Sequence, residues 1–207
     1  MNRRTYFTLS FVGMLCLAAG GTVSAATFQV TNGNDSGPGS LREAITQAEA
    51  NAEADEILLG TVTVALASQL PDITTDVTIV GQGWADSVID GGNSPGGSDG
   101  VKAFWVAAPG NLILDGVNVT NCYHSGGAGV TSLGQLTVID SRFSDNRVSA
   151  YGGALSISGG NTTLVDSTFV GNEANGGGAV VMTSTASLDA DGCTVTSNSA
   201  LGGTHFG

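Results

Sequence analysis

Four aspartates recur at nearly equal intervals in the second half of the chain. Asp115, Asp140, Asp166 and Asp191 each follow an apolar or small residue, and Arg142 lies two positions after the second of them. If successive copies stack, neighbouring carboxylates about 5 Å apart repel one another unless a cation such as Ca²⁺ lies between them. The spacing therefore suggests a Ca²⁺ ladder, with Asp140, Asp166 and Arg142 as candidate catalytic residues.

A structural interpretation competes with the chemical one and is favoured. Each aspartate could cap its own turn by accepting backbone N–H groups. The ladder continues evenly through all four copies, whereas a catalytic site should interrupt a repeat. We therefore assign no catalytic residue, no metal site and no cofactor, and keep the Asp140, Asp166 and Arg142 set as the alternative.

Few other side chains suggest chemistry. His124 and His205 occupy different positions of the repeat, so they do not predict a metal site, which needs several converging ligands. Trp84 and Trp105 could present aromatic platforms to sugar rings, although packing in the core or the cap is the favoured role.

The elements that must position these residues are short and repeated. The glycine pairs that begin at Gly126, Gly152, Gly177 and Gly202 are 26, 25 and 25 residues apart. Each pair precedes a short run that is mostly small or apolar, and a Phe-x-x-Asn series keeps step with it. Two or three β-like runs rich in Thr, Val and Ile occupy each period, separated by Gly, Asn, Asp or Ser.

One such unit cannot bury its apolar face alone, but stacked copies can. The period is too short for a propeller blade. The sequence therefore predicts an all-β fold, a right-handed single-stranded parallel β-helix with a short N-terminal capping helix. Equivalent residues should stack in columns, with phenylalanines inside, asparagines at a left-handed turn and glycine pairs at the tightest corner. The predicted columns are Phe143, Phe169 and Val195; Asn146, Asn172 and Asn198; and Gly152, Gly153, Gly177 and Gly178.

The N-terminal quarter has a different character. Residues 1–25 combine an early positive charge, an apolar stretch and small residues, which predicts a secretory signal cleaved before Ala26. Residues 26–59 are predicted to form a cap, with an amphipathic helix over about 40–52 that begins at a Ser40/Glu43 capping box. Residues 60–207 form the β-helix, with clear repeats from about residue 111.

Charge and cysteine usage limit the partners and the cross-links. The net charge of −12 disfavours nucleic acid and anionic membranes, and no segment beyond the signal is predicted to span a bilayer. Cys122 and Cys193 lie three coils apart, about 14 Å, which is too far for a disulfide. We expect two free thiols and a monomer.

The repeated Gly-Gly-Ala-aliphatic and Phe-x-x-Asn motifs resemble those of chlamydial-type polymorphic outer-membrane proteins. The segment from Thr27 to Ile45 resembles the CSLREA-type N-terminus of exported β-helix proteins, with Gly39 where that motif has Cys. The resemblance implies export and an adhesive, autotransporter-passenger role. Since a strand-like run is still in progress at Gly207 and no membrane barrel follows, we expect the chain to be a fragment of a longer protein.

These observations predict a secreted or surface-associated protein with a structural or adhesive role. Its ligand would be an extracellular polysaccharide or a host or cell-surface group. The alternative function is a carbohydrate-active β-helix enzyme, either a polysaccharide lyase that resembles the pectate lyases or a glycosidase.

Overall fold

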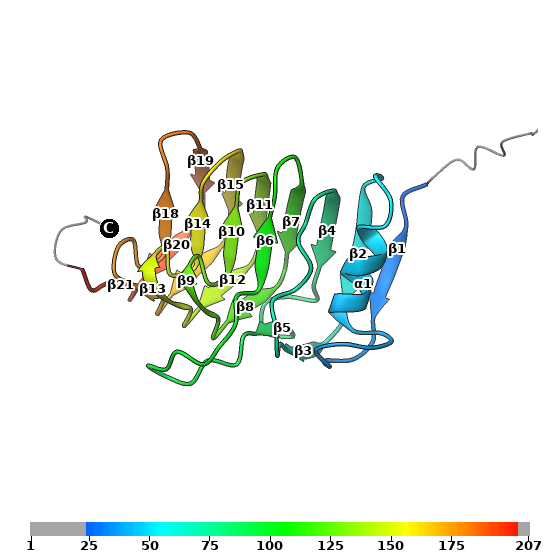
Figure 1. Ribbon diagram of the computed structural model, residues 1–207, viewed down its shortest axis with the longest axis horizontal. Helices are drawn as coiled ribbons and strands as arrows, with labels where there is room; N and C mark the ends of the chain where they lie inside the picture. The colour runs from blue at the N-terminus through cyan, green and yellow to red at the C-terminus, as the bar shows by residue number, and fades with distance from the viewer. Residues whose placement is uncertain (1–23, 203–207) are drawn as a thin grey trace, which may run out of the picture.

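The computed structural model describes residues 24–202, which coil into a parallel β-solenoid (Figure 1). Strands of successive coils lie side by side in four sheets, and every strand pair is parallel. This confirms the predicted all-β, stacked-coil fold. The predicted signal segment lies outside the described residues except for Ser24 and Ala25, and so does His205.

The four sheets are named A to D. Sheet A contains β1 (Thr27–Val30), β2 (Asp55–Leu59), β4 (Asp76–Val80), β7 (Asn111–Asp115), β11 (Gln135–Ile139), β15 (Asn161–Val165) and β19 (Ser187–Asp191). Sheet B contains β3 (Val62–Ala65), β5 (Ser87–Asp90), β8 (Asn118–Thr120), β12 (Arg142–Ser144), β16 (Thr168–Val170) and β20 (Thr194–Thr196). Sheet C contains β6 (Phe104–Val106), β10 (Val130–Ser132), β14 (Leu155–Ile157) and β18 (Val180–Met182). Sheet D contains β9 (Tyr123–Gly126), β13 (Arg147–Tyr151), β17 (Glu173–Ala174) and β21 (Ser199–Ala200).

Sheet D was not expected, because only two or three strands per coil were predicted. Its strands carry mostly polar or small residues and leave most of them at least partly exposed, as β9 (Tyr-His-Ser-Gly) illustrates. Such runs lack the apolar alternation by which a strand is recognised in a sequence. The strands form because the coils above and below supply hydrogen-bonding partners.

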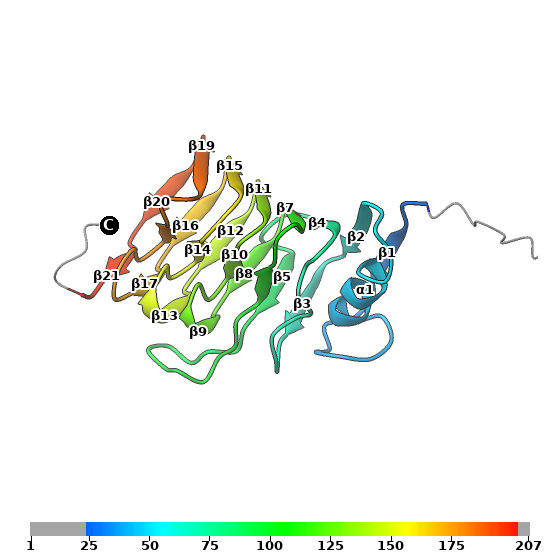
Figure 2. The same ribbon diagram turned by 45° about the horizontal axis from the view of Figure 1, so that its top comes forward.

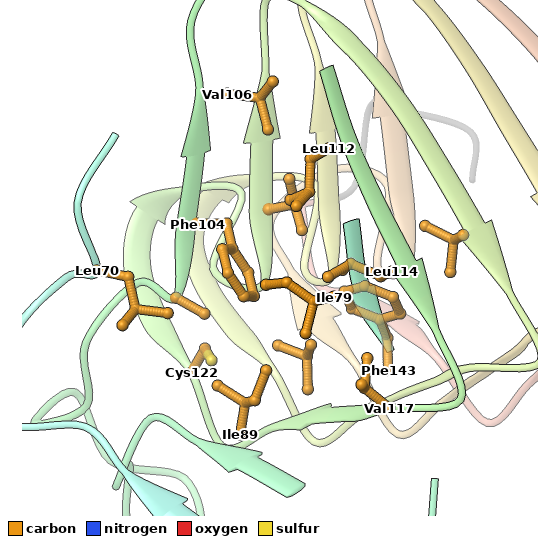
Figure 3. Packing of buried hydrophobic residues seen from close by; sticks show 14 of the residues in the cluster. Leu70, Ile79, Ile89, Phe104, Val106, Leu112, Leu114, Val117, Cys122 and Phe143 are labelled. Atoms are coloured by element: carbon orange, nitrogen blue, oxygen red, sulfur yellow. The ribbon is translucent and has the colours of Figure 1, made fainter. Parts of the chain in front are cut away.

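The core runs through the centre of the coil. In β11 the side chains of Leu136 and Val138 are buried, whereas Thr137 between them is only partly covered. Side chains on a strand alternate between its two faces, so each sheet sends every second residue inward. Figure 3 shows these apolar side chains converging from different strands, among them Phe104, Leu114 and Phe143.

The predicted phenylalanine column is present. Phe143 lies opposite Phe169, and Phe169 lies opposite Val195. The two rings stack with their centres 5.3 Å apart and an angle of 10° between their planes. Both rings are fully buried, while Val195 in the last described coil is 62% exposed.

The asparagine column is a chain of buried hydrogen bonds. The Oδ1 atom of Asn172 accepts from the backbone N–H (3.1 Å) and the Nδ2 group (3.0 Å) of Asn146. Asn198 accepts from the same two groups of Asn172, each at 2.9 Å. Each Nδ2 group also donates to a carbonyl of the preceding coil, such as Val119 O for Asn146. The stacked amides therefore link successive coils as well as closing their turns.

Two details of this column differ from the prediction. The left-handed backbone is not at the asparagines but one residue earlier, at Asp145 (φ 56°) and Ser197 (φ 56°), for example. In the first clear coil, Asn121 (φ 49°) takes that turn position, so Cys122 occupies the asparagine column and its N–H donates to Asn146 Oδ1 at 3.0 Å. Cys122 is buried and Cys193 partly exposed, and both thiols are free, as predicted.

Glycine is required where coils approach most closely. A Cβ atom on Gly153 would lie 1.9 Å from the carbonyl oxygen of Gly178 in the next coil. Gly177 has φ 61°, in the left-handed region that side chains disfavour. The glycine pairs therefore do mark tight corners.

One short helix packs at the N-terminal end. Helix α1 (Leu41–Ala48) buries its apolar face against β1 and β2. Ser40 Oγ accepts from the Glu43 N–H (3.2 Å), and the Glu43 carboxylate accepts from the Gly39 N–H (2.6 Å), so the capping box forms with Gly39 as its second donor. The helix ends before the predicted residue 52, and the carboxylate of its C-cap, Glu49, instead accepts hydrogen bonds from the Thr74–Thr75 segment.

Strand β1 is the end strand of sheet A and pairs only with β2, and helix α1 contacts both strands. Within residues 24–202, no helix has the length and apolar character that a membrane crossing requires.

A loop over residues 91–100 leaves the stack of coils between β5 and β6. It extends along the side of β9 and β13 (Figures 1 and 2).

Candidate functional site

The four predicted aspartates do not form a single column. Asp115 ends β7 and lies opposite Ile139, and Asp191 lies opposite Val165. Asp140 and Asp166 come one residue after Ile139 and Val165, at left-handed turn positions with φ of 44° and 47°. The predicted four-carboxylate ladder is therefore wrong in register. The coil from β7 to β11 is two residues shorter than the next one, which a comparison of spacings alone does not reveal.

Asp115 and Asp140 are nevertheless close enough to influence each other. Burial raises the pKa of the Asp115 carboxyl, and the negative charge of Asp140 raises it further. Within residues 24–202, no group of three or more His, Cys, Asp or Glu side chains is arranged to hold a metal ion.

Arg142, the predicted basic partner of these carboxylates, is engaged elsewhere. Its guanidinium carbon lies 5.1 Å from the centre of the Trp84 ring, which is the geometry of a cation–π contact. Trp84 is 48% exposed, so the packing role favoured for it from the sequence is wrong. Trp105 is only partly exposed and contacts Lys102.

The side chains next to Arg142 on sheet B are polar and hydrogen-bonded between coils. Asn118 lies opposite Arg142, and Thr120 lies opposite Ser144. The Ser144 hydroxyl is 3.0 Å from Thr120 Oγ1 and 3.3 Å from Asn118 Oδ1. The Ser144 and Thr120 side chains are both buried, so these hydroxyls bond to neighbouring coils rather than facing solvent.

A polar groove lies at the end of this face, where the 91–100 loop approaches the coils. Its volume is about 320 Å³, within the range of small-ligand sites. Loop residues form one wall, and the turns after sheet B form the other. The groove is lined by Asn93, Ser94, Pro95, Gly96, Asn121, Asp145, Asn146, Arg147, Gly171 and Glu173.

Arg147 holds the two walls of the groove together. Its Nε group donates to Glu173 Oε1 at 2.6 Å, and its Nη1 group donates to the carbonyls of Gly96 and Gly97, the latter at 2.8 Å. The loop also binds itself, since the Asp99 carboxylate accepts from the N–H and hydroxyl of Ser94. The groove is thus preformed by hydrogen bonds within the chain.

The sequence interpretation missed this groove. Arg147 and Glu173 are one period apart and carry opposite charges, which could have suggested an ion pair between stacked coils. The path of the 91–100 loop had no comparable signal, because an insertion does not follow the repeat.

A buried lysine lies near the junction of sheets C and D. The Lys102 side chain is 3% exposed, and its Nζ atom lies 4.7 Å from the centre of the Trp105 ring. Burial lowers the pKa of Lys102 to about 8, although the Asp72 carboxylate acts in the opposite direction. His124 is near enough that its pKa is lowered by burial and by the Lys102 charge. We infer that the Lys102 ammonium is held at a cost to stability.

Because of this cost, the free energy of unfolding should depend on pH. In the folded chain, Lys102 loses its proton near pH 8, whereas in the unfolded chain it loses it near its ordinary pKa of 10.5. At a pH between these two values, the unfolded state therefore binds more protons than the folded state. The free energy of unfolding should therefore rise as the pH rises through this window, by up to about 3 kcal/mol. Urea titrations across the window should show the rise in the wild type and its loss in Lys102→Met. A variant that keeps the same slope would contradict the assignment.

Together the fold and the site define a parallel β-solenoid with a preformed polar groove on one side. Comparison of the chain with protein families, curated proteins and solved structures finds no match. The resemblance to polymorphic outer-membrane protein repeats and to the CSLREA-type segment therefore stays a prediction from the residues that carry it.

Proposed function

We propose that the chain is an exported β-solenoid, secreted or held at a bacterial cell surface, with a structural or adhesive role. Its ligand is an extracellular polysaccharide or a cell-surface glycan. The observation that carries this proposal is the polar groove beneath the 91–100 loop, at the place where the repeat is interrupted. A rigid, regular stack gives such a groove a fixed position away from the N-terminal end.

The chemistry of the groove supports a hydroxylated ligand. Amide, carboxylate and backbone carbonyl groups line it, and such groups exchange hydrogen bonds with sugar hydroxyls. Arg147 already donates to Glu173 and to the loop carbonyls, so it supports the walls rather than presenting a free cation. Asp145, which is exposed in the groove, is the carboxylate best placed to accept from a ligand.

Binding of the purified chain to immobilised extracellular polysaccharides and cell-surface glycans tests the proposal. Asp145→Ala should lower the affinity about tenfold, because a hydrogen bond to a charged group contributes about 1.5–3 kcal/mol. Asp189→Ala changes an equally exposed carboxylate on β19 and should bind as the wild type does. Failure of the wild type to bind any of these glycans, or equal losses in both variants, would contradict the proposal.

A second candidate is a carbohydrate-active enzyme, favoured by the interaction between Asp115 and Asp140. A carboxyl group with a raised pKa beside an ionised one is the arrangement that glycoside hydrolysis uses. Samples from the binding experiment can be assayed for new reducing ends and for unsaturated products. Their release by the wild type but not by Asp115→Asn would support hydrolysis or elimination over simple adhesion.

A further inference from the structure

An exposed tryptophan is held on an anchored loop between β4 and β5. Trp84 is 48% exposed. The loop is fixed to the neighbouring coil, because Gly81 N donates to Asp115 O (2.8 Å) and Gly83 N donates to Gly116 O (3.1 Å). The indole is therefore an apolar surface kept in water at a defined position, rather than a side chain on a mobile segment.

Arg142 fixes the orientation of this ring. Its guanidinium lies over Trp84 at 5.1 Å, although the two residues come from different coils. Arg42 and Arg147 each pair with a carboxylate, but within residues 24–202 the Arg142 side chain makes no ion pair and no hydrogen bond to a protein group. Contact with Arg142 covers one face of the indole and leaves guanidinium N–H groups available beside it.

Two aspartates belong to the segments that carry this aromatic surface. The Asp115 carbonyl oxygen accepts from the Gly81 N–H of the Trp84 loop, and Asp140 comes two residues before Arg142 in the chain. An apolar ring face flanked by donors and acceptors matches a sugar, whose C–H groups cover one face of the ring and whose hydroxyls surround its edge. Within the described chain, no other exposed tryptophan has this setting.

The net charge of the chain indicates which class of saccharide can bind at this surface. The net charge is −12, and two of the groups at this surface are carboxylates. A polyanionic saccharide would be repelled over long distances, whereas a neutral one would not. The surface around Trp84 and Arg142 therefore favours a neutral polysaccharide as its ligand.

We infer that Trp84, Arg142, Asp115 and Asp140 form a subsite for one sugar of a neutral polysaccharide, with Trp84 stacking on the ring and Arg142 as its positioning residue. This inference rests on the proposed adhesive function and names its ligand class. Strand β12 leads from Arg142 to Ser144, and Asp145 of the groove follows directly, so the two sites are about 10 Å apart along one strand. A polymer can occupy both, which a single sugar cannot.

Tryptophan fluorescence during titration with a neutral glucan, with polygalacturonate as the polyanionic comparison, tests the inference. The glucan should change the emission of the wild type, and Trp84→Ala should abolish most of that change and weaken binding about tenfold. Arg142→Lys, which keeps the charge but not the planar group, should weaken binding less than Trp84→Ala. Tyr151→Ala removes an equally exposed ring from sheet D and serves as the control.

The outcomes separate this inference from the proposed function. Glucan binding that is lost in Asp145→Ala but unchanged in Trp84→Ala would overturn the subsite and leave the adhesive function standing. A preference for polygalacturonate would overturn the neutral class. No binding of any saccharide by the wild type would overturn both.

Discussion

Replacing Phe143 by alanine is expected to lower the free energy of unfolding by about 4 kcal/mol. The ring is fully buried and stacks on Phe169 at 5.3 Å, and a Cβ atom on Gly129 would already lie 2.9 Å from its Cδ1 atom. Packing this close leaves a cavity when the ring is removed, because neighbouring coils tied by strand hydrogen bonds cannot move inward. Urea unfolding followed by far-ultraviolet circular dichroism measures the loss.

The same column supplies a matched control. Val195 continues it in the last described coil but is 62% exposed, so Val195→Ala should cost less than about 1 kcal/mol. Similar losses in Phe143→Ala and Val195→Ala would show that the column does not form the interior of the stack.

Replacing Asn172 by alanine is expected to cost about 3–4 kcal/mol, although no charge and little apolar area are lost. The Asn172 amide accepts two hydrogen bonds from Asn146 and donates to Phe143 O and Asn198 Oδ1. Alanine leaves several of these buried groups without a partner, and each unsatisfied group costs about 1–3 kcal/mol. Thermal and urea unfolding should both record the loss.

Two further variants identify the amide as the cause. Asn172→Asp keeps the shape but removes the donors, and should destabilise the chain at least as much at neutral pH. Asn175→Ala removes an exposed amide whose Nδ2 group donates only to Ser149 O, and should change the stability by less than about 1 kcal/mol. A stable Asn172→Asp variant would show that the asparagine column merely fills space.

Much of the fold could be predicted from the sequence, because residues one period apart occupy equivalent places in a stack. This reasoning placed Phe143 opposite Phe169 and the asparagines in one column, both of which the structure contains. It failed where a coil changes length. The shorter coil after β7 moves Asp115 out of line with Asp140, and the first clear coil places Cys122 where asparagine was expected.

The candidate site could be predicted only in part. Asp140 was chosen because it follows the repeat, and Arg142 because it lies close to Asp140 in the sequence. The structure instead pairs Arg142 with Trp84, from a loop that does not follow the repeat. The groove likewise depends on where the 91–100 loop crosses the coils and on the hydrogen bond that Arg147 donates to the Gly97 carbonyl.

The sequence by itself determined the stacked coil, its apolar interior and its glycine corners, because burial and tight turns impose the same residue types at the same phase of every repeat. Only the tertiary structure decided the register of the aspartates, the strands of sheet D and the meeting of Trp84 with Arg142. These depend on coil lengths and loop paths, which are set by hydrogen bonds between distant segments and leave no periodic pattern in the chain.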